Sequence, residues 1–389
     1  MLSVAEARAR VLALGQVTGV ERVPLTGGLG RVLAEPLSAT HDQPPFRTAT
    51  MDGYAVFGSA GAVGDQFTVI GQARAGEAFR GELVAGQVIR IFTGAPVPDS
   101  SERVIIQEDV AVAGTTITLT DKLESGANIR AVGADFRVGQ SLLPRRLSPF
   151  DLALAAAMNH ATLPVRRKPV VAIIATGDEL VAPGSVLAAD QIIASNSYGI
   201  AGLVERAGGI AQILPIARDT AESLKAAFDL AEGADLILTI GGASVGEHDL
   251  VKAVAGEMGL DLDFWKIAMR PGKPLLAGRL NGVPMIGLPG NPVSALVCSI
   301  LFVVPLVEAM LGLPSDDMPL SEATLMVPLD ANGGRTHFMR ARLGAGGVTA
   351  FDSQDSALLS VLAEADALIV RPPGDPARAT GERVPVLLL

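Results

Sequence analysis

Apolar runs alternate with amphipathic segments through the second half of the chain. Five segments read as strands: 170–176, 210–217, 235–240, 262–269 and 283–288. The first of them is apolar at successive positions, as is expected of a strand buried on both faces of a sheet. Because helix-like segments separate the strands, the pattern predicts a parallel sheet with helices on both faces, a doubly wound α/β domain over 168–313.

The segments between these strands carry signals for helix starts. Two helices are predicted near 196–207 and 249–258. Another is expected to open at Asp219, where Glu222 lies three positions on and would complete a capping box. A long helix is predicted to begin at Pro292, with Asn291 as its N-cap.

The rest of the chain has a different pattern. Residues 21–145 are rich in short β-branched runs separated by glycine turns, and a helix is expected at 148–158, with Ser148 as its cap and Pro149 at its first position. The prediction is a multidomain α/β plus β protein with four domains. These are an extended helical domain (1–20 with 38–45 and 140–167), a β-rich domain (21–37 with 46–139), the α/β domain (168–313) and a C-terminal β domain (314–389).

Composition and charge narrow the range of partners. A chain of 389 residues with 49% hydrophobic residues can bury several cores. Its net charge is −10 and no stretch is strongly basic, so no nucleic acid and no membrane is expected as a partner. The longest apolar run, 300–307, contains Pro305 and is too short to cross a bilayer. Residues 1–15 resemble an amphipathic helix and not a signal peptide, so a cytoplasmic protein is expected.

The thiol and imidazole groups do not indicate a reactive site. Cys298 is the only cysteine and lies in an apolar stretch, where a buried thiol is the simpler interpretation. A single cysteine excludes an intrachain disulfide and fits a reducing compartment. The four histidines are scattered without the spacing of a zinc site.

Three glycine-rich turns follow apolar strands: ATGDEL at 175–180, TIGGASVGEHD at 239–249 and GLPGNPVSA at 287–295. Loops after the carboxyl ends of parallel strands lie at one edge of the sheet, where ligands bind. Glycine tolerates positive φ angles and lets backbone N–H groups face an anion. We therefore expect the turns to form one binding site for a phosphorylated ligand. The expected binding residues are Gly241, Gly242, Ser244, Gly246, Gly290 and Asn291.

Acidic residues lie at strand ends or helix starts of the same domain: Asp178, Glu179, Asp219 and Asp249. Carboxylates beside a phosphate would repel it unless a hard cation lies between them, and Mg²⁺ typically takes one or two carboxylates together with phosphate oxygens. The pattern therefore predicts Mg²⁺, with Glu179 as a ligand. For Asp219 and Asp249 two interpretations stay open, a metal ligand or a helix N-cap.

Basic residues occur together in FWKIAMRPGKP at 264–274. If this segment is one strand, its period of two places Lys266 and Arg270 on one face at the edge of the sheet. Two cations there, with Lys273 beside them, would bind an oxyanion, for which arginine offers bidentate geometry. In the β-rich region Asp52, Thr93 and Asp135 read as turn residues by type, and no mechanism follows for them from the sequence alone.

Seven motifs occur in order along the chain: MDGYAV, TGAPVP, NIR followed by GxD, TGDEL, GGASVGEHD, WKxxxxPGKP and LPGNPVSA. In this order the chain resembles the MoeA family of molybdopterin molybdenumtransferases, related to the E domain of gephyrin. The strong matches run over about 45–295, with weaker ones to the C-terminus. The resemblance implies elongated homodimers of four domains and insertion of molybdenum from molybdate into adenylylated molybdopterin, with Mg²⁺ and with release of AMP.

The resemblance also implies roles for particular residues. The site would lie between protomers, with the α/β domain of one facing the β-rich domain of the other. Positions matching the family's catalytic residues are Asp52, Thr93, Asp135, Glu179, Asp219, Asp249, Lys266 and Arg270. Of these, Glu179, Asp219 and Asp249 would hold the metal. Binding residues implied in addition are Lys273, Pro289, Pro292, Arg340 and Ser356.

The sequence departs from the family pattern at a few positions. Arg270 stands where a second lysine is expected, Thr48 and Ala49 replace an Asn-Ser pair, and SSERVI replaces a Gly-Ala-Asp stretch. Two alternative functions stay open. One is a molybdopterin carrier or scaffold without turnover, since fold alone does not set function. The other is a molybdopterin adenylyltransferase, against which the additional β-rich domains argue.

Overall fold

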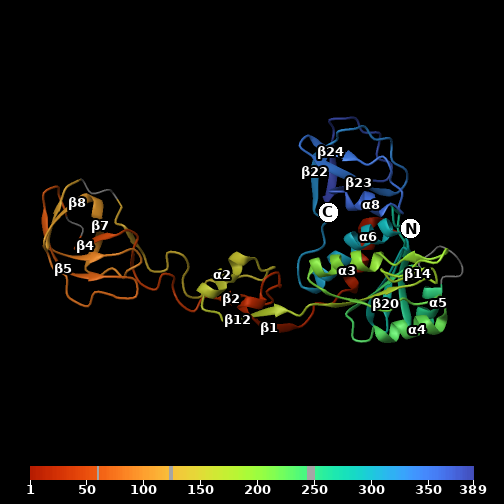
Figure 1. The fold of residues 1–389 in the computed structure, drawn as a ribbon, viewed down its shortest axis with the longest axis horizontal. Helices are drawn as coiled ribbons and strands as arrows, with labels where there is room; N and C mark the ends of the chain where they lie inside the picture. The colour runs from red at the N-terminus through yellow and green to blue at the C-terminus, as the bar shows by residue number, and fades with distance from the viewer. Residues whose placement is uncertain (59–60, 122–125, 243–249) are drawn as a thin grey trace. The chain divides into compact units, whose positions relative to one another are not determined.

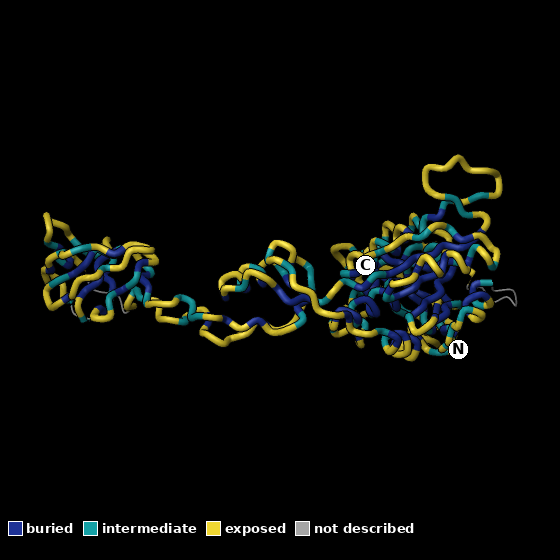
Figure 2. The backbone as a smooth tube through the Cα atoms, turned by 90° about the horizontal axis from the view of Figure 1, so that it is seen from below, coloured by how far each residue is buried: buried dark blue, intermediate teal, exposed yellow. Residues whose placement is uncertain are grey.

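The computed structural model describes the chain except residues 59–60, 122–125 and 243–249. The described residues form two compact units. The first comprises residues 1–21, 30–34 and 164–389, and the second comprises 22–29 and 35–163. In each unit the buried residues are concentrated in the interior (Figure 2). The four-domain division expected from the sequence is finer than these two units and stays a prediction.

A six-stranded sheet in the order β16-β13-β17-β21-β20-β18 forms the centre of the first unit. Its strands are β13 (Val170–Ala175), β16 (Ile210–Ile213), β17 (Leu236–Ile240), β18 (Leu260–Lys266), β20 (Pro274–Leu280) and β21 (Val283–Leu288). The first four strands of that order are parallel, whereas β20 and β18 run antiparallel. The prediction of an all-parallel sheet is therefore wrong at this edge.

The antiparallel edge follows from a short turn. Leu280 pairs with Val283, so only Asn281 and Gly282 connect β20 to β21. Both have positive φ angles, 50° and 87°, which is the conformation of a type I′ hairpin turn. A two-residue connection forces its strands to be antiparallel, and the Asn-Gly signal at 281–282 was present in the sequence.

Helices cover both faces of this sheet, as predicted (Figure 1). Val171 and Ile173 of β13 pack into one core with α3 (Asn196–Ala207), while Ala172 and Ile174 pack into the other core. Alternate residues of β13 therefore point to opposite faces of the sheet, as expected for a strand. The second core also contains residues of the helices α4 (Ala221–Leu230) and α5 (Leu250–Glu257).

The cap of α4 differs from the prediction. Its N-cap is Thr220, whose hydroxyl accepts a hydrogen bond from the Ser223 amide at 3.2 Å. Because the helix begins one residue later than expected, Glu222 lies at its second position and forms no capping box. Asp219 precedes the cap, so its carboxylate is not used to start the helix.

The longest helical run crosses the core of the first unit. It joins α6 (Pro292–Cys298), a π-helical turn (Ser299–Val303) and α7 (Val304–Met310). The run has 19 residues and a mean hydropathy of 2.3, so by length and composition it could cross a membrane, and the estimate from 300–307 was too short. Most of it, 72%, is buried inside the unit, as in the core helix of a globular domain.

A buried arginine compensates for the proline in this run. Pro305 has no N–H group, so it cannot donate to the carbonyl of Leu301 four residues earlier. The guanidinium of Arg8, from α1 (Val4–Leu14), donates to that carbonyl at 2.5 Å and to the Ser315 carbonyl at 2.9 Å. Arg8 is 7% exposed, so α1 supplies the missing donor from inside the core.

Replacing Arg8 with methionine should lower the free energy of unfolding by about 2–3 kcal/mol, because buried carbonyl groups lose a charged donor while the aliphatic volume is kept. Urea unfolding followed by circular dichroism measures the change. The matched control is Arg10→Met on the same helix, where a half-exposed side chain pairs with Asp263 at 2.9 Å and about 0.5 kcal/mol or less is expected. Equal losses in the two variants would contradict this role for Arg8.

The C-terminal part of the first unit forms a second sheet in the order β19-β23-β25-β26-β22, with β24 paired to β23. Its strands are β19 (Met269–Arg270), β22 (Leu320–Thr324), β23 (Thr336–Gly344), β24 (Gly347–Ala350), β25 (Ala367–Arg371) and β26 (Arg383–Leu388). This confirms a β-rich C-terminal region. Short elements complete the unit: α8 (Leu359–Ala363), β14 (Leu180–Val181) and β15 (Ile192–Ile193).

The second unit contains a six-stranded sheet in the order β7-β4-β6-β5-β9-β8. Its strands are β4 (Gly53–Phe57), β5 (Gln66–Ala73), β6 (Gln87–Ile91), β7 (Ser101–Ile106), β8 (Val110–Ala113) and β9 (Thr116–Leu119). The predicted β-rich region is confirmed. Helix α2 (Pro149–Ala157) begins as expected, with Ser148 as its N-cap and Pro149 at its first position.

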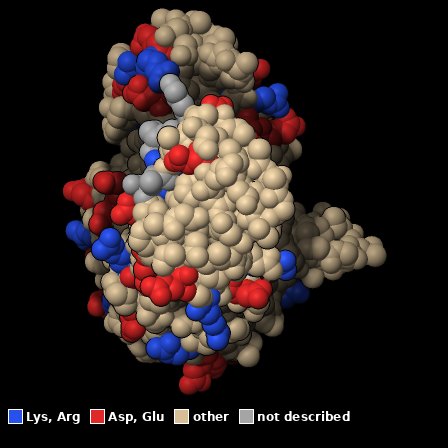
Figure 3. Space-filling view, turned by 90° about the vertical axis from the view of Figure 1, so that its left-hand side faces the viewer, with Lys and Arg blue, Asp and Glu red and all other residues tan. Residues whose placement is uncertain are grey.

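Small two-stranded sheets accompany these elements: β1 (Val20–Pro24) with β12 (Thr162–Arg166), β2 (Leu37–Ser38) with β11 (Ser141–Leu142), and β3 (Thr48–Ala49) with β10 (Ile129–Arg130). Two 3₁₀ turns lie at Leu25–Gly27 and Gln107–Asp109. On the face drawn in Figure 3, basic and acidic side chains are interspersed, and the described residues present no extended basic surface there.

Candidate functional site

The turns after three parallel strands line one cavity of about 980 Å³ in the first unit. Thr176 and Gly177 follow β13, Gly241 and Gly242 follow β17, and 289–292 follows β21. The strands β13, β17 and β21 are neighbours in the sheet and run in the same direction, so their carboxyl ends meet at one edge. The expected convergence of the three turns is confirmed for the described residues.

Backbone hydrogen bonds join these turns to one another. The Thr176 amide donates to the Ile240 carbonyl at 3.0 Å, and the Gly241 amide donates to the Leu288 carbonyl at 3.1 Å. Gly241 has a φ of 91°, and a Cβ atom there would come within 2.8 Å of the Thr176 carbonyl oxygen. Glycine is therefore required at Gly241 both for its conformation and for close packing of two turns.

Two acidic side chains, Glu179 and Asp219, line the cavity. The Asp219 amide donates to the Asp178 carboxylate at 3.3 Å. Burial raises the pKa of Asp219, and the negative charges of Asp178 and Glu179 raise it further. The acids therefore repel one another, which is the electrostatic condition that favours a bound cation.

The third predicted acid, Asp249, lies outside the described residues, as do Ser244 and Gly246. Within the described part of the chain, no three carboxylate, imidazole or thiol groups lie close enough to hold a metal ion. The structure thus brings together two of the three predicted metal ligands and leaves the position of Asp249 as a prediction.

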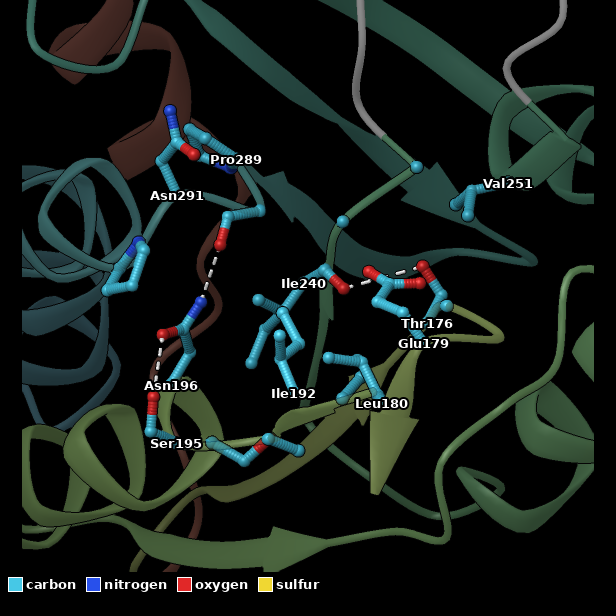
Figure 4. Close-up of a pocket in the computed structure, with 18 of the residues that line it drawn as sticks. Thr176, Glu179, Leu180, Ile192, Ser195, Asn196, Ile240, Val251, Pro289 and Asn291 are labelled. Carbon is cyan, nitrogen blue, oxygen red and sulfur yellow. Dashed lines mark hydrogen bonds between the residues drawn. The ribbon is translucent and has the colours of Figure 1, made fainter. Parts of the chain in front are cut away.

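The wall opposite the acids is formed by α3 and the 289–292 turn (Figure 4). The Asn196 side-chain amide donates to the Gly290 carbonyl at 2.8 Å. Asn291 is the N-cap of α6, but its side chain forms no cap; it donates to the Ser356 hydroxyl at 3.0 Å. The Val293 amide donates to the Ser356 carbonyl at 3.1 Å, so the C-terminal region is joined to this turn.

The residues 195–197 line the cavity and were not predicted as site residues. The sequence pattern predicts them only as the start of a helix, and the bounds 196–207 of this helix are confirmed. The usable signal was the polar run Ser-Asn-Ser directly after an apolar segment.

Lys266 and Arg270 do not share a strand, so this prediction is wrong. Lys266 ends β18, and the chain then leaves that sheet because the Ala268 amide donates to the Leu2 carbonyl at 2.8 Å. Arg270 lies in β19, which pairs with β23 of the second sheet. The Lys266 ammonium lies 3.7 Å from the centre of the Trp265 ring. Lys273 is exposed, and none of these cations lines the cavity described above.

Arg270 lines a separate cavity of about 820 Å³ in the C-terminal region, together with His337. Burial lowers the pKa of His337 to about 4, and the nearby positive charge of Arg270 contributes to the shift. The same cavity is also lined by the acidic residues Asp330, Asp352 and Glu382.

Arg340 is buried and stabilises the segment before Ser356. It is 1% exposed, and its guanidinium donates to the Asp355 carbonyl at 2.6 Å and to the Gln354 side chain at 3.2 Å. Burial lowers its pKa. Because its donors are directed at the segment that leads to Ser356, Arg340 orders that segment and does not line the cavity beside Ser356.

The remaining predicted residues lie in the second unit. One Asp52 carboxylate oxygen accepts hydrogen bonds from both the amide and the hydroxyl of Thr93, each at 2.8 Å. The hydrogen bond from the Thr93 amide, and next the hydrogen bond from the Thr93 hydroxyl, lower the pKa of Asp52. Asp135 is exposed, and its amide donates to the Gln43 carbonyl at 2.9 Å. Asp52 and Thr93 therefore form a hydrogen-bonded pair with one negative charge, on Asp52. The sequence motifs did not reveal this pairing.

Known family models match three segments of the chain. Residues 2–159 match the MoeA N-terminal region (domain I and II), 172–309 a probable molybdopterin binding domain, and 322–389 the MoeA C-terminal region (domain IV). The second match contains the α/β sheet and most of the cavity lining. The fold and the cavity thus define a multidomain protein built around an α/β domain of the molybdopterin-binding type.

Whole-chain relatives make the assignment specific. A molybdopterin molybdenumtransferase from Haemophilus influenzae is 36% identical over 80% of this chain and 78% of its own length, and one from Bacillus subtilis is 32% identical over 100% and 94%. The crystal structure of a molybdopterin biosynthesis MoeA protein from Pyrococcus horikoshii has a TM-score of 0.86 and 32% identity, covering 100% of this chain and 99% of that one. The chain belongs to the MoeA family.

Proposed function

We propose that the protein inserts molybdenum from molybdate into adenylylated molybdopterin and releases AMP, as the last step of molybdenum cofactor biosynthesis. One observation carries the proposal: three loops after parallel strands line one large cavity in a chain whose relatives are named molybdopterin molybdenumtransferases. Ligand cavities are typically roughly 300–1,000 Å³, so a nucleotide-sized compound fits. As a soluble biosynthetic enzyme the protein would act in the cytoplasm.

The acidic end of the cavity fits Mg²⁺. Glu179 and Asp219 would hold it, with Asp249 as a further ligand, and phosphate oxygens would complete the coordination. Burial raises the pKa of Asp219, and repulsion by Asp178 and Glu179 raises it further; a bound cation would relieve that repulsion. When bound, Mg²⁺ neutralises charge on the phosphoanhydride.

The three turns would position the phosphates of the substrate through their backbone amides. The amides of Gly242, Gly290 and Asn291 have no protein acceptor within the described part of the chain, so they are available to substrate oxygens. Lys266 and Arg270 are proposed to bind molybdate, a role that rests on the family resemblance. Catalysis would then rest on placement and electrostatics, without a side-chain nucleophile.

We propose further that the protein is a homodimer and that Asp52, Thr93 and Asp135 complete the site of the partner subunit. The family resemblance supports this arrangement. The ionised Asp52, held by Thr93, supplies a carboxylate in a fixed orientation.

Subunit complementation tests the shared site. Asp52→Ala and Asp219→Ala change different units of the chain, and each variant is expected to be inactive alone. Random heterodimers of the two would contain one intact site, so co-expression should restore about one quarter of the wild-type rate. Differential tags and mass spectrometry confirm that heterodimers form. No restored activity in a preparation that contains heterodimers would contradict a site built from two protomers.

Turnover distinguishes the proposed function from its alternatives. The protein is incubated with adenylylated molybdopterin and Mg²⁺, with and without molybdate, and AMP is quantified by chromatography. We expect AMP release that requires molybdate. A carrier would bind the compound without releasing AMP, and an adenylyltransferase would instead consume ATP with molybdopterin; either result would overturn the proposal.

A further inference from the structure

The Asp52 carboxylate uses only one of its two oxygens within the described part of the chain. Thr93 donates to that oxygen from its amide and from its hydroxyl, each at 2.8 Å, while the second oxygen accepts no hydrogen bond from a described residue. A carboxylate oxygen can accept a hydrogen bond or bind a cation. The direction of the open oxygen therefore depends on what holds the segments around Asp52 and Thr93 in place.

One side chain, Arg90, contacts both of these segments. It lies in β6, directly opposite Tyr54 of β4. Its guanidinium carbon lies 5.0 Å from the centre of the Tyr54 ring and 5.0 Å from the centre of the Phe92 ring. Tyr54 lies two residues after Asp52, and Phe92 directly precedes Thr93. Because arginine stacks favourably on aromatic faces, a single cation joins the segments that carry the two members of the pair.

The hydrogen bonds of Arg90 are directed at the same region. One guanidinium nitrogen donates to the Gly53 carbonyl at 3.3 Å, and the other donates to the Gln107 side chain at 2.6 Å. The Gln107 amide in turn donates to the Asp52 carbonyl at 3.1 Å. The carbonyl groups of two successive residues, Asp52 and Gly53, are thus held by Arg90 or by its partner Gln107. This arrangement restricts rotation of the backbone that carries the Asp52 side chain.

The charge of Arg90 acts on Asp52 without occupying its open oxygen. The hydrogen bonds from Thr93 lower the pKa of Asp52 most, and the positive charge of Arg90 lowers it further. The donors of the guanidinium are directed at Gly53 and Gln107, whereas a direct ion pair would take up the carboxylate oxygens. Arg90 therefore favours the ionised carboxylate and leaves its second oxygen open.

A second arginine beside the same ring lacks these contacts. Arg74 lies 5.7 Å from the centre of the Phe92 ring, and its guanidinium donates to the Gln72 side chain at 3.3 Å. Arg74 is exposed, and among the described residues its side chain forms no hydrogen bond with the segment that carries Asp52. A cation near Phe92 is therefore not enough to hold the pair, and Arg74 provides a matched control.

We propose that Arg90 is a positioning residue for the reaction: it holds the segments 52–54 and 92–93 together, so that Asp52 presents one fixed and one open oxygen to the site that it completes. The inference rests on the proposed function, in which Asp52 contributes to the site of the partner subunit. Arg90 itself is directed at its own unit and does not need to touch the substrate.

Kinetics of the full-length protein test the role in the reaction. Arg90→Met keeps an apolar contact with the two rings but removes the charge and the donors. We expect kcat for molybdate-dependent AMP release to fall about tenfold or more, since misplacing a catalytic group is costly. KM for adenylylated molybdopterin should change by less than about twofold, because no contact with the substrate is removed. Arg74→Met, the same chemical change beside the same ring, should have the kinetics of the wild type.

Crystal structures of wild type, Arg90→Met and Arg74→Met test the positioning directly. In Arg90→Met the Asp52 side chain should leave Thr93 or occupy more than one position, and in Arg74→Met it should stay in place. If both Thr93 hydrogen bonds to Asp52 persist in Arg90→Met, or if Arg74→Met loses as much rate, the proposal is overturned.

The two measurements together separate the positioning role from the proposed function. A displaced Asp52 with an unchanged kcat would overturn the role of Arg90 in the reaction and would also remove Asp52 from the site. If the wild type released no AMP, the proposed function would fall, and the crystal structures would still decide whether Arg90 holds Asp52 in place.

Discussion

Replacing Asp219 with asparagine should slow molybdate-dependent AMP release by about 10²–10³-fold, the range found when a group that stabilises developing charge is removed. The substituted side chain would keep the shape of the carboxylate but not the charge that is proposed to hold Mg²⁺. Initial rates at increasing Mg²⁺ concentrations measure the effect, and the half-saturating concentration should rise. Because Asp219 is repelled by Asp178 and Glu179, the melting temperature should not fall.

A slower rate together with an unchanged melting temperature would indicate that Asp219 acts in function and not in stability. The matched control is Glu222→Gln, a carboxylate in the first turn of α4 that does not line the cavity; its rate and Mg²⁺ requirement should match those of the wild type. An Asp219→Asn variant with an unchanged rate at every Mg²⁺ concentration would remove Asp219 from the site. A lower rate accompanied by a lower melting temperature would point to a structural role.

Replacing Gly53 with alanine should destabilise the second unit by about 3 kcal/mol or more, because overpacking against rigid backbone is among the costlier single changes. A Cβ atom at Gly53 would lie 1.9 Å from the Ile105 carbonyl oxygen and 3.1 Å from the Ile106 Cα. Gly53 lies in β4, between β6 and β7, so the strand pairing itself would have to shift. Urea unfolding of the purified protein gives the change.

The matched control for this clash is Gly27→Ala in the same unit, where the nearest atom would be 3.7 Å from the added Cβ. Its stability should stay within about 0.5 kcal/mol of the wild type, as for most substitutions away from special features. A Gly53→Ala protein as stable as Gly27→Ala would show that β4 and β7 can separate at little cost. The MDGY motif, which by itself could be just a turn, includes this glycine of a close strand pair.

Much of the fold follows from local pattern. Apolar runs located the parallel strands, and the bounds of α3 were predicted correctly because an apolar periodicity and a terminal glycine, Gly208 with a φ of 102°, mark its extent. The gathering of the three turns also followed, since strand direction and neighbour order place loops at one edge. The antiparallel edge is missing from the sequence prediction because 274–280 is not among the predicted strands, so the Asn281–Gly282 turn has no first strand to connect.

The side-chain part of the site was less predictable. Lys266 and Arg270 were assigned to one face by strand period, but the break between them arises from a pairing with Leu2, far away in the sequence. Arg340 is a binding residue only by the family resemblance, and its burial reveals that it orders the segment before Ser356. The contact between Asn196 and Gly290 joins residues 94 positions apart, and no local pattern encodes it.

The packing of α1 has a consequence for biosynthesis. Val4, Ala7 and Val11 belong to the same core as strands and helices beyond residue 164, while 35–163 forms the other unit. During translation, the apolar face of the segment 1–21 therefore stays exposed. Its packing partners are synthesised only after more than a hundred further residues. The intervening unit can fold meanwhile, since domains fold as units during synthesis. The nascent chain in this interval is a natural client for chaperones that shield apolar helices.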